Sequence, residues 1–228
     1  QALESLIVNI KNKFRDVDNN ESGKIILFTS PTAQNGKSFV TRNFAKKLSQ
    51  IGKKVLLLDS DFKRGDQNQH FNFSKITVKD FNEINDENID AFKADEDFYF
   101  IPKISRLGSS FQFIYSAQFN EKLEYFKKTF DYIVIDTSPI LSVSDTSMLL
   151  TLADMNLFIS RHELTKINEV KQLMSISRQV GIEFDGLVYN AYKKPSGYYG
   201  YYGLYGNYAY QYYAQKYLYD SYDYKKED

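Results

Sequence analysis

The sequence predicts a doubly wound α/β fold, in which a mostly parallel sheet is flanked by helices. Three observations predict it. Short apolar runs rich in Val, Ile, Leu and Phe alternate with amphipathic segments along residues 24–190. The apolar runs are continuous, which is typical of strands buried on both faces of a parallel sheet. Two of the amphipathic segments end at a glycine, Gly52 and Gly181, as helices often do.

Six apolar runs are expected to form the strands. In chain order they are 25–28, 55–58, 99–101, 133–135, 157–159 and 186–188. Residues 39–51, 119–130 and 167–180 repeat apolar side chains at helical spacing, which predicts helices. Strands that alternate with helices imply right-handed βαβ units, and ligands of that architecture bind beyond the carboxyl ends of the strands. Functional residues are therefore expected directly after the strands.

The composition of the 228 residues excludes several classes of protein. Lys+Arg and Asp+Glu both number 29, and this zero formal charge argues against a general nucleic-acid binder. The absence of cysteine excludes disulfides, thiolate nucleophiles and cysteine-bound zinc. No apolar run approaches the roughly 20 residues that a membrane helix needs, so the segment itself is expected to be soluble. Gln1 in place of an initiating Met suggests a piece of a longer protein.

The C-terminal segment 193–228 differs in composition from the rest of the chain. Of the 19 tyrosines, 13 lie there among Gly, Asn and Gln, and the segment has no aliphatic face. Such a segment cannot build its own core, so a flexible tail is expected after an ordered domain at 1–192. Its tyrosines are Tyr198, Tyr199, Tyr201, Tyr202, Tyr205, Tyr208, Tyr210, Tyr212, Tyr213, Tyr217, Tyr219, Tyr222 and Tyr224.

A phosphate-binding loop is expected after the first strand. Residues 30–38 read Ser-Pro-Thr-Ala-Gln-Asn-Gly-Lys-Ser and lie between a predicted strand and a predicted helix. In such a loop the backbone N–H groups and the helix N-terminus attract phosphate, a lysine contacts the β- and γ-phosphates, and a serine hydroxyl ligates Mg²⁺. Lys37 and Ser38 are the candidates for these two roles. The candidate nucleotide-binding residues here are Thr32, Ala33, Gln34, Asn35, Gly36, Lys37, Ser38 and Phe39.

Carboxylates follow two further strands. Asp59 and Asp61 come directly after the second strand, and Asp136 follows the run 133–135. Near a phosphate loop the pair is a candidate for magnesium binding and general-base catalysis, and Asp136 fits the Walker B acid that holds Mg²⁺. Together with the loop, these acids predict a site for a nucleoside triphosphate, with ATP and Mg²⁺ as ligands. The candidate catalytic residues are Lys37, Asp59, Asp61 and Asp136, and the candidate metal ligands are Ser38, Asp59, Asp61 and Asp136.

These motifs resemble those of the bacterial tyrosine kinases (BY-kinases), which are the cytoplasmic catalytic domains of Wzc- and CapB-type polysaccharide co-polymerases. Residues 36–38 are similar to the family's Walker A motif, residues 57–61 to its Walker A′ motif, and residues 133–139 to Walker B. Residues 186–190 resemble the strand whose terminal asparagine faces the adenine. This resemblance adds Asn190 to the candidate nucleotide-binding residues.

The resemblance implies a P-loop NTPase fold of the MinD/ParA type and an ATP-dependent protein-tyrosine kinase. The tail tyrosines match the family's autophosphorylation cluster, so they are the expected phosphoacceptors. Asp59 is the expected base for the tyrosine proton and Asp61 is expected near the metal, although the sequence alone does not order the two. The expected partners are further copies of the chain in a ring, a neighbour's tail as substrate, a tyrosine phosphatase and the polysaccharide export machinery. The whole protein would lie at the cytoplasmic face of the bacterial inner membrane.

The chain departs from the family pattern at three places. Lys63 and Arg64 stand near the position of a family arginine, and residues 104–110 replace a proline-rich stretch. In the N-terminal helix, expected with its linker at 1–22, Ile7 and Ile10 stand where the family's oligomerisation motif has arginines. Ring assembly through the usual ion pairs is therefore in question, and an apolar contact is the available substitute.

Two other functions fit parts of the sequence. A MinD/ParA-like ATPase that switches partner or membrane binding shares the strands and the acids. Such ATPases usually carry a lysine where this chain has Thr32, and they have no use for a tyrosine tail. A non-catalytic tyrosine-rich interaction module would leave the lysine and the acids unexplained. Mass spectrometry of the tail after incubation with ATP and Mg²⁺ distinguishes these alternatives.

Overall fold

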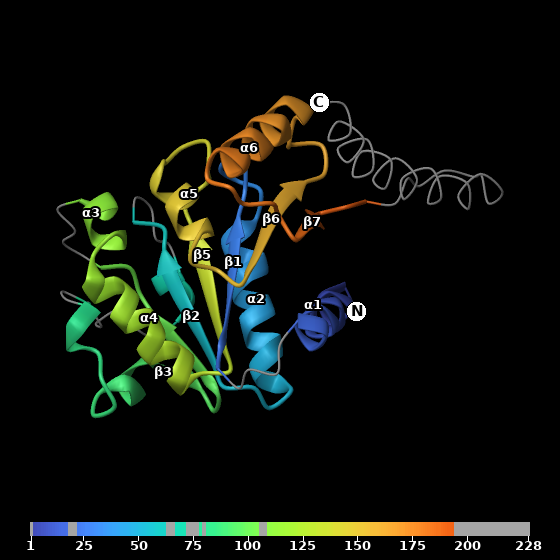
Figure 1. Cartoon of the computed structure of the whole chain (residues 1–228). Coiled ribbons are helices and arrows are strands. Elements are labelled where there is room, and N and C mark those ends of the chain that lie inside the picture. Colours follow the sequence, from blue (N-terminus) through green and yellow to red (C-terminus); the bar gives the residue numbers. More distant parts are fainter. Residues whose placement is uncertain are drawn as a thin grey trace. The chain divides into compact units, whose positions relative to one another are not determined.

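A seven-stranded sheet forms the centre of the part of the chain that the computed structural model describes, residues 2–17, 22–62, 67–71, 78, 81–104 and 109–193 (Figure 1). The strands are β1 (Lys24–Thr29), β2 (Val55–Ser60), β3 (Lys93–Asp95), β4 (Phe98–Ile101), β5 (Tyr132–Thr137), β6 (Met155–Arg161) and β7 (Gly186–Asn190). Their order is β3-β4-β2-β5-β1-β6-β7, and every pair of neighbours is parallel except β3 with β4. The predicted mostly parallel sheet is therefore confirmed.

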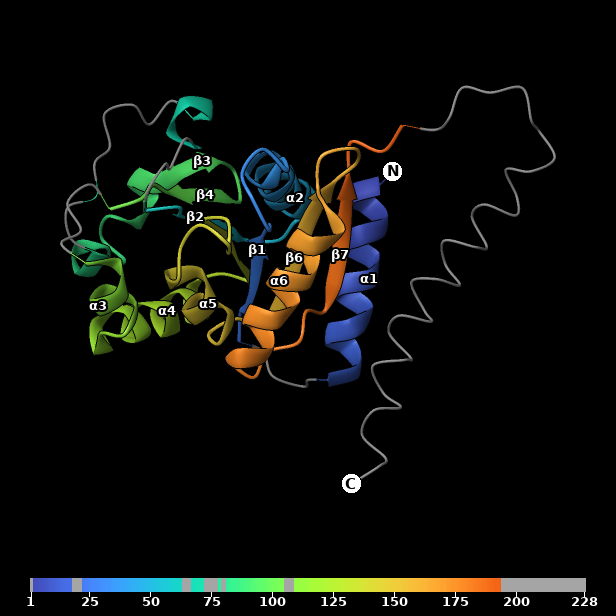
Figure 2. The ribbon, with the colours of Figure 1, turned by 90° about the horizontal axis from the view of Figure 1, so that it is seen from above.

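Helices cover both faces of the sheet, as Figure 2 shows from above. One face carries α1 (Ala2–Val17) and α2 (Lys37–Gln50), and the other carries α3 (Ser110–Ile114), α4 (Ala117–Thr129), α5 (Asp145–Leu150) and α6 (Ile167–Gln179). The short 3₁₀ helices η1 (Gln67–His70), η2 (Phe81–Glu83) and η3 (Ile89–Phe92) lie between β2 and β3 in the chain. None of the helices in these ranges combines the length and the apolar character that crossing a bilayer requires.

Two apolar layers, one on each face of the sheet, hold the helices in place. Leu58 of β2 belongs to the layer that includes Phe126 of α4, whereas Leu57 belongs to the layer that includes Phe44 of α2. Side chains of a strand point alternately to the two faces. Asp59 lies two residues after Leu57 in the same strand, so this alternation directs its carboxylate towards the face that carries α2.

Helix α1 packs against the same face as α2. Ile7 and Ile10 are 5% and 4% exposed and belong to the α2-side layer. Glu4 at the start of α1 pairs with Lys47 of α2 at 3.1 Å. Both isoleucines are thus used inside their own chain. The apolar substitute expected for the ring-forming arginines is therefore not available from these two side chains.

Three apolar side chains near helix ends do not belong to the buried layers, and several predictions fall outside the described residues. Phe39 and Ile51 of the predicted helix 39–51 are 61% and 45% exposed, and Ile167, the first residue of α6, is 74% exposed. The described residues belong, up to Tyr192, to one compact unit that spans Gln1–Tyr192. Residues 63–66 and 194–228 are outside the described residues. The predicted role of the tail and the division of the chain at 192/193 therefore stay predictions.

Candidate active site

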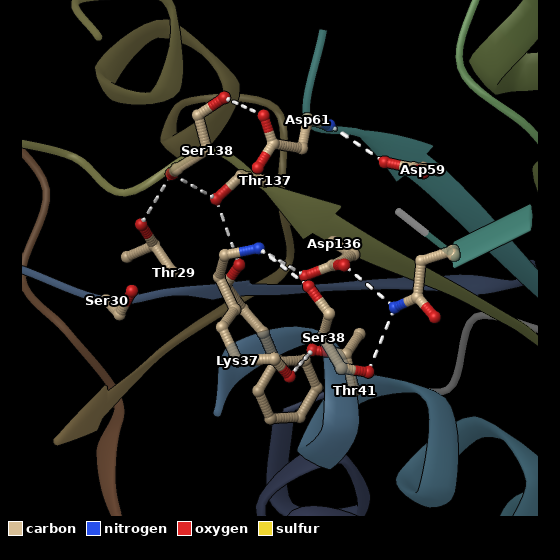
Figure 3. Close-up of polar contacts among 12 residues, drawn as sticks. Thr29, Ser30, Lys37, Ser38, Thr41, Asp59, Asp61, Asp136, Thr137 and Ser138 are labelled. Carbon is tan, nitrogen blue, oxygen red and sulfur yellow. Dashed lines mark hydrogen bonds and ion pairs between the residues drawn. The ribbon is translucent and has the colours of Figure 1, made fainter. Parts of the chain in front are cut away.

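The carboxyl ends of three neighbouring strands bring the predicted charged residues together (Figure 3). β5 lies between β1 and β2, and the register of these strands pairs Asp136 with Phe28 on one side and with Asp59 on the other. The loop after β1 leads into α2, whose first residue is Lys37. Asp61 follows β2 directly. One edge of the sheet therefore gathers all four residues that the sequence nominated as catalytic.

Lys37 is a buried cation that forms an ion pair with Asp136. Its Nζ lies 2.6 Å from Oδ1 of Asp136, and the two side chains are 6% and 1% exposed. The same Nζ lies 3.5 Å from Oγ of Ser38. A buried charge without a partner costs several kcal/mol, so the ion pair allows the lysine to stay at the base of the loop. Phosphate oxygens are negatively charged like the Asp136 carboxylate, so they can replace that carboxylate as the partner of Lys37.

Asp59 is a buried carboxyl group whose two oxygens differ in their hydrogen bonds. Its Oδ1 accepts the backbone N–H of Asp61 at 3.0 Å, and its Oδ2 has no hydrogen-bond partner among the described residues. Burial, with the negative charge of Asp136 as the second cause, raises the pKa of Asp59 to about 7. An oxygen of this kind is suited to accept a proton or to contact a divalent cation.

Asp61 has a different environment, because a hydroxyl orients its carboxylate. Oγ of Ser138 donates to Oδ1 of Asp61 at 2.7 Å (Figure 3). Ser138 is 4% exposed and lies two residues after Asp136. Sequence reasoning missed this serine. Its place directly after the Walker B strand was the signal available for it.

The phosphate loop has a conformation that requires glycine at position 36. Gly36 has a φ of 82°, in the left-handed region that disfavours side chains. A Cβ at this position would also lie 2.1 Å from Nδ2 of Asn190. That Nδ2 donates to the carbonyl of Asn35 at 2.9 Å. Asn190 therefore contacts the loop itself, and its predicted contact with adenine stays a prediction.

Further polar contacts hold the loop from inside and from β6. The buried side chain of Asn35 donates through Nδ2 to the carbonyl of Thr32 at 2.7 Å and accepts the hydroxyl of Thr165 at its Oδ1. Arg161, at the end of β6, donates through Nη1 to the carbonyl of Gln34 at 2.9 Å. Arg161 and Thr165 carry no motif, so the sequence did not point to them. Ala33 and Phe39, two of the predicted nucleotide-binding residues, are exposed.

The donors present fit Mg²⁺ that is held jointly with phosphate. Within the described residues, no three Asp, Glu or His side chains form a preformed metal cluster. Mg²⁺ usually keeps several waters and is bound through one or two carboxylates together with substrate phosphates. The Oδ2 of Asp59, the carboxylate of Asp136 and the hydroxyl of Ser38 match that requirement at the N-terminus of a helix.

Comparison with known proteins agrees with this geometry. The sequence matches the AAA domain family over residues 23–185. The tyrosine-protein kinase ptk of Acinetobacter johnsonii is 30% identical over 204 residues, which are 87% of this chain and 27% of that protein. The structure of the BceF tyrosine kinase domain is 25% identical with a TM-score of 0.65, and the match covers 82% of this chain and 75% of that one.

The cell division ATPase MinD of Pyrococcus furiosus shares the fold, with a TM-score of 0.61 and 22% identity over 76% of this chain and 74% of its own. The chain spans about a quarter of the length of the curated relatives that it matches. The predicted P-loop fold of the MinD/ParA type is confirmed. The chain therefore belongs to the AAA domain family, and its resemblance to the catalytic domains of bacterial tyrosine kinases is confirmed.

Proposed function

We propose that this chain is the catalytic domain of an ATP-dependent protein-tyrosine kinase that phosphorylates its own C-terminal tyrosines. The observation that carries the proposal is the convergence of Lys37 with three carboxylates at the N-terminus of α2. The 13 tyrosines in the segment 193–228 supply acceptor hydroxyls on the same chain. Similarity to proteins named tyrosine kinases supports the same activity.

Each charged group has a separate role in the proposed transfer. Lys37 exchanges Asp136 for the β- and γ-phosphates, and the backbone N–H groups of the loop and of the first turn of α2 hold the phosphate oxygens. Ser38 and Asp136 hold Mg²⁺, and Asp61 supports them. ATP and Mg²⁺ supply the phosphoryl group and the positive charge that neutralises it.

Asp59 is the proposed base for the tyrosine hydroxyl. Its Oδ2 has no partner among the described residues, whereas Oδ1 of Asp61 accepts the Ser138 hydroxyl. The tyrosine proton goes to Oδ2 of Asp59 as the tyrosine oxygen bonds to the γ-phosphorus. The bond between that phosphorus and the oxygen that bridges it to the β-phosphorus breaks, and ADP leaves. An Asp59→Asn variant that is far more active than Asp61→Asn would reverse these two assignments.

The decisive experiment measures tail phosphorylation in a Lys37→Met variant. Phosphoryl transfer depends mainly on positioning and charge stabilisation, so removing the lysine should lower the rate by about 100- to 1,000-fold. The measurement is quantitative mass spectrometry of the tail after incubation with ATP and Mg²⁺. Lys46→Met, an exposed position on the same helix, is the matched control and should keep the wild-type rate. Near-normal phosphorylation in Lys37→Met would contradict the proposal.

A second candidate function is an ATPase switch of the MinD/ParA kind. The shared fold with MinD favours it. The same incubation separates the two functions, because a switch ATPase releases phosphate from ATP and leaves the tyrosines unmodified. Ongoing hydrolysis with an unmodified tail would therefore select the switch, and transfer to the tail selects the kinase.

The proposal extends to the whole protein, on the basis of the resemblance to Wzc- and CapB-type proteins. In that role the domain acts as an oligomer at the cytoplasmic face of the inner membrane and regulates the assembly and export of capsular or exopolysaccharide. A tyrosine phosphatase reverses the modification. Lys37→Met in the whole protein should change the amount or length of the exported polysaccharide, and unchanged polysaccharide would contradict this wider role.

A further inference from the structure

Gln67 of η1 is a buried amide that no sequence motif singled out. Gln67 is 1% exposed, and both the nitrogen and the oxygen of its side-chain amide are hydrogen-bonded. Nε2 donates to Oδ2 of Asp136 at 2.8 Å and to the backbone carbonyl of Ser38 at 2.9 Å. Oε1 accepts Nη1 of Arg42 at 3.0 Å. One amide nitrogen therefore bridges the two residues that the proposed function assigns to Mg²⁺.

The direction of this amide is fixed by its three partners. Arg42 only donates hydrogen bonds, and the partners of Nε2 only accept them when Asp136 is ionised. Turning the amide over would place Oε1 against the Asp136 carboxylate and the Ser38 carbonyl, and would place the amino group against Arg42. Arg42 therefore selects the orientation in which Gln67 donates towards the site.

The Asp136 carboxylate is held on both of its oxygens. Lys37 contacts Oδ1 at 2.6 Å and Gln67 contacts Oδ2 at 2.8 Å. In the proposed reaction Lys37 moves to the phosphates, which frees Oδ1. The contact with Gln67 does not depend on that move, so it can keep the carboxylate in position while Oδ1 faces the metal.

The geometry points to Gln67, oriented by Arg42, as a positioning residue that holds Asp136 and Ser38 in the arrangement that binds Mg²⁺ with the nucleotide. The inference rests on the proposed function for the presence of Mg²⁺ and nucleotide at this site. It does not depend on transfer to tyrosine. Removal of residues that orient metal ligands costs about 10- to 100-fold in metal affinity or activity, which sets the size of the expected effect.

The test compares nucleotide binding with and without Mg²⁺. The probe is a fluorescent ATP analogue that is titrated with the full chain, first in EDTA and then at increasing Mg²⁺. Gln67→Met fills a similar volume but has no amide, so it leaves Asp136 and Ser38 without their donor. The expected result is an unchanged affinity in EDTA and about a 10- to 100-fold loss of the gain in affinity that Mg²⁺ provides.

Arg42 variants give a second line of evidence if Gln67→Met folds poorly. Arg42→Met should reduce the Mg²⁺ effect in the same direction, and Arg42→Lys, which restores a donor to Oε1, should recover part of it. Gln50→Met, exposed at the end of α2, is the matched control and should behave as wild type. Thermal unfolding identifies any variant that has lost its fold. If Gln67→Met is unfolded, the comparison uses Arg42→Met, and if Arg42→Met is unfolded, it uses Gln67→Met.

The outcomes separate the proposals. An equal loss of affinity in EDTA and in Mg²⁺ would overturn the role of Gln67, since it would show an effect on the loop and not on the metal. A full Mg²⁺ effect in folded Gln67→Met and Arg42→Met would overturn it as well. Wild-type protein that binds nucleotide with Mg²⁺ dependence but never modifies tyrosine would refute the kinase and would keep the role of Gln67. Binding without any Mg²⁺ dependence in the wild type would overturn the role of Gln67 and the assignment of Mg²⁺ to Ser38 and Asp136, whereas tail phosphorylation alone decides the kinase.

Discussion

At the scale of the single residue, the burial of Asp59 in the site lowers the stability of the fold when its carboxyl group is ionised. Its carboxyl group is 1% exposed and lies beside Asp136, and its pKa is raised to about 7. An aspartate in an unfolded chain has a pKa of about 3.9. Between these two values the folded protein binds more protons than the unfolded one, so its stability falls as the pH rises. The loss is complete above the folded pKa.

Asp59→Asn should therefore be more stable than the wild type at about pH 8 in EDTA, with a difference that shrinks towards about pH 4. Asparagine cannot ionise, so the variant lacks this part of the pH dependence. Thermal unfolding of both proteins across that range is the measurement, and a shift of a few degrees is expected. Glu121→Gln, an exposed position on α4, is the control and should follow the wild type. A difference that grows towards low pH would contradict the prediction.

Gly36 gives a second prediction at the same scale, because two glycines of the chain share a backbone conformation but not surroundings. Gly36 and Gly52 have φ values of 82° and 77°. A Cβ at Gly36 meets Nδ2 of Asn190 at 2.1 Å, whereas a Cβ at Gly52 meets nothing within 4 Å. Gly52→Ala should cost only the left-handed backbone penalty of about 1–2 kcal/mol. Gly36→Ala should cost more in urea unfolding.

The comparison has its own internal check. In an Asn190→Ala background, Gly36→Ala should lower the free energy of unfolding by only as much as Gly52→Ala does in the wild type. The reason is that the clash disappears with the asparagine side chain. A double variant as unstable as the two single changes added together would show that the contact with Asn190 is not the cause.

At the scale of elements, α1 is a structural part of the domain. Ile10 is 4% exposed in the α2-side layer, and Lys13 of the same helix contacts Asp185 in the connection that leads to β7. Ile10→Ala should destabilise the protein by about 2–5 kcal/mol through lost burial and the cavity left behind. Val8→Ala, at a position that is 55% exposed, is the control and should cost much less in urea unfolding. Equal effects of the two changes would contradict the packing described for α1.

Elements could be predicted from the sequence where their apolar pattern is continuous. The six predicted strands and the four predicted helices, the N-terminal one included, are present, with ends shifted by a few residues. β3 was missed because Lys93–Asp95 is three exposed residues at the edge of the sheet, without an apolar run. α3 and α5 are too short for a helical period to be recognised.

The site divides in the same way. Lys37, Asp59 and Asp136 could be predicted because each follows a strand that the pattern reveals. Ser138 was missed although it follows the Walker B strand directly. Gln67 could not be predicted, because its role depends on contacts made only in the folded chain, and it is separated from Asp136 by 69 positions. A local motif does not reveal a contact between residues so far apart in the sequence. Residues that orient the charged groups can therefore be identified only in the folded structure.

At the scale of the whole molecule, we predict that phosphorylation occurs between chains. Residues 193–228 are rich in glycine and polar residues, and the prediction is that a segment of this composition is long and flexible enough to reach a neighbour's site. The substrate is a full-length Lys37→Met chain, and the enzyme is an active chain that ends at residue 192. The Lys37→Met chain should become labelled on its tail, as measured by mass spectrometry. The same mixture with Lys37→Met in both chains is the control and should stay unlabelled.

Competence of the shortened chain is established with a synthetic peptide that carries the tail sequence. If that peptide is modified and the full-length Lys37→Met chain is not, even at high concentration, then transfer within one chain is the correct description.

The pairing of Asp59 with Asp136 across β2 and β5 also limits how this domain can vary in evolution. One residue inserted into β2 or deleted from it would turn Asp59 from the α2 face to the face that carries α4. An insertion or deletion of two residues would return Asp59 to the α2 face but would move its carboxylate by about 7 Å along the strand. Either change separates the acids. Homologous chains that keep this chemistry should therefore differ in length between the strands and not within β2 or β5.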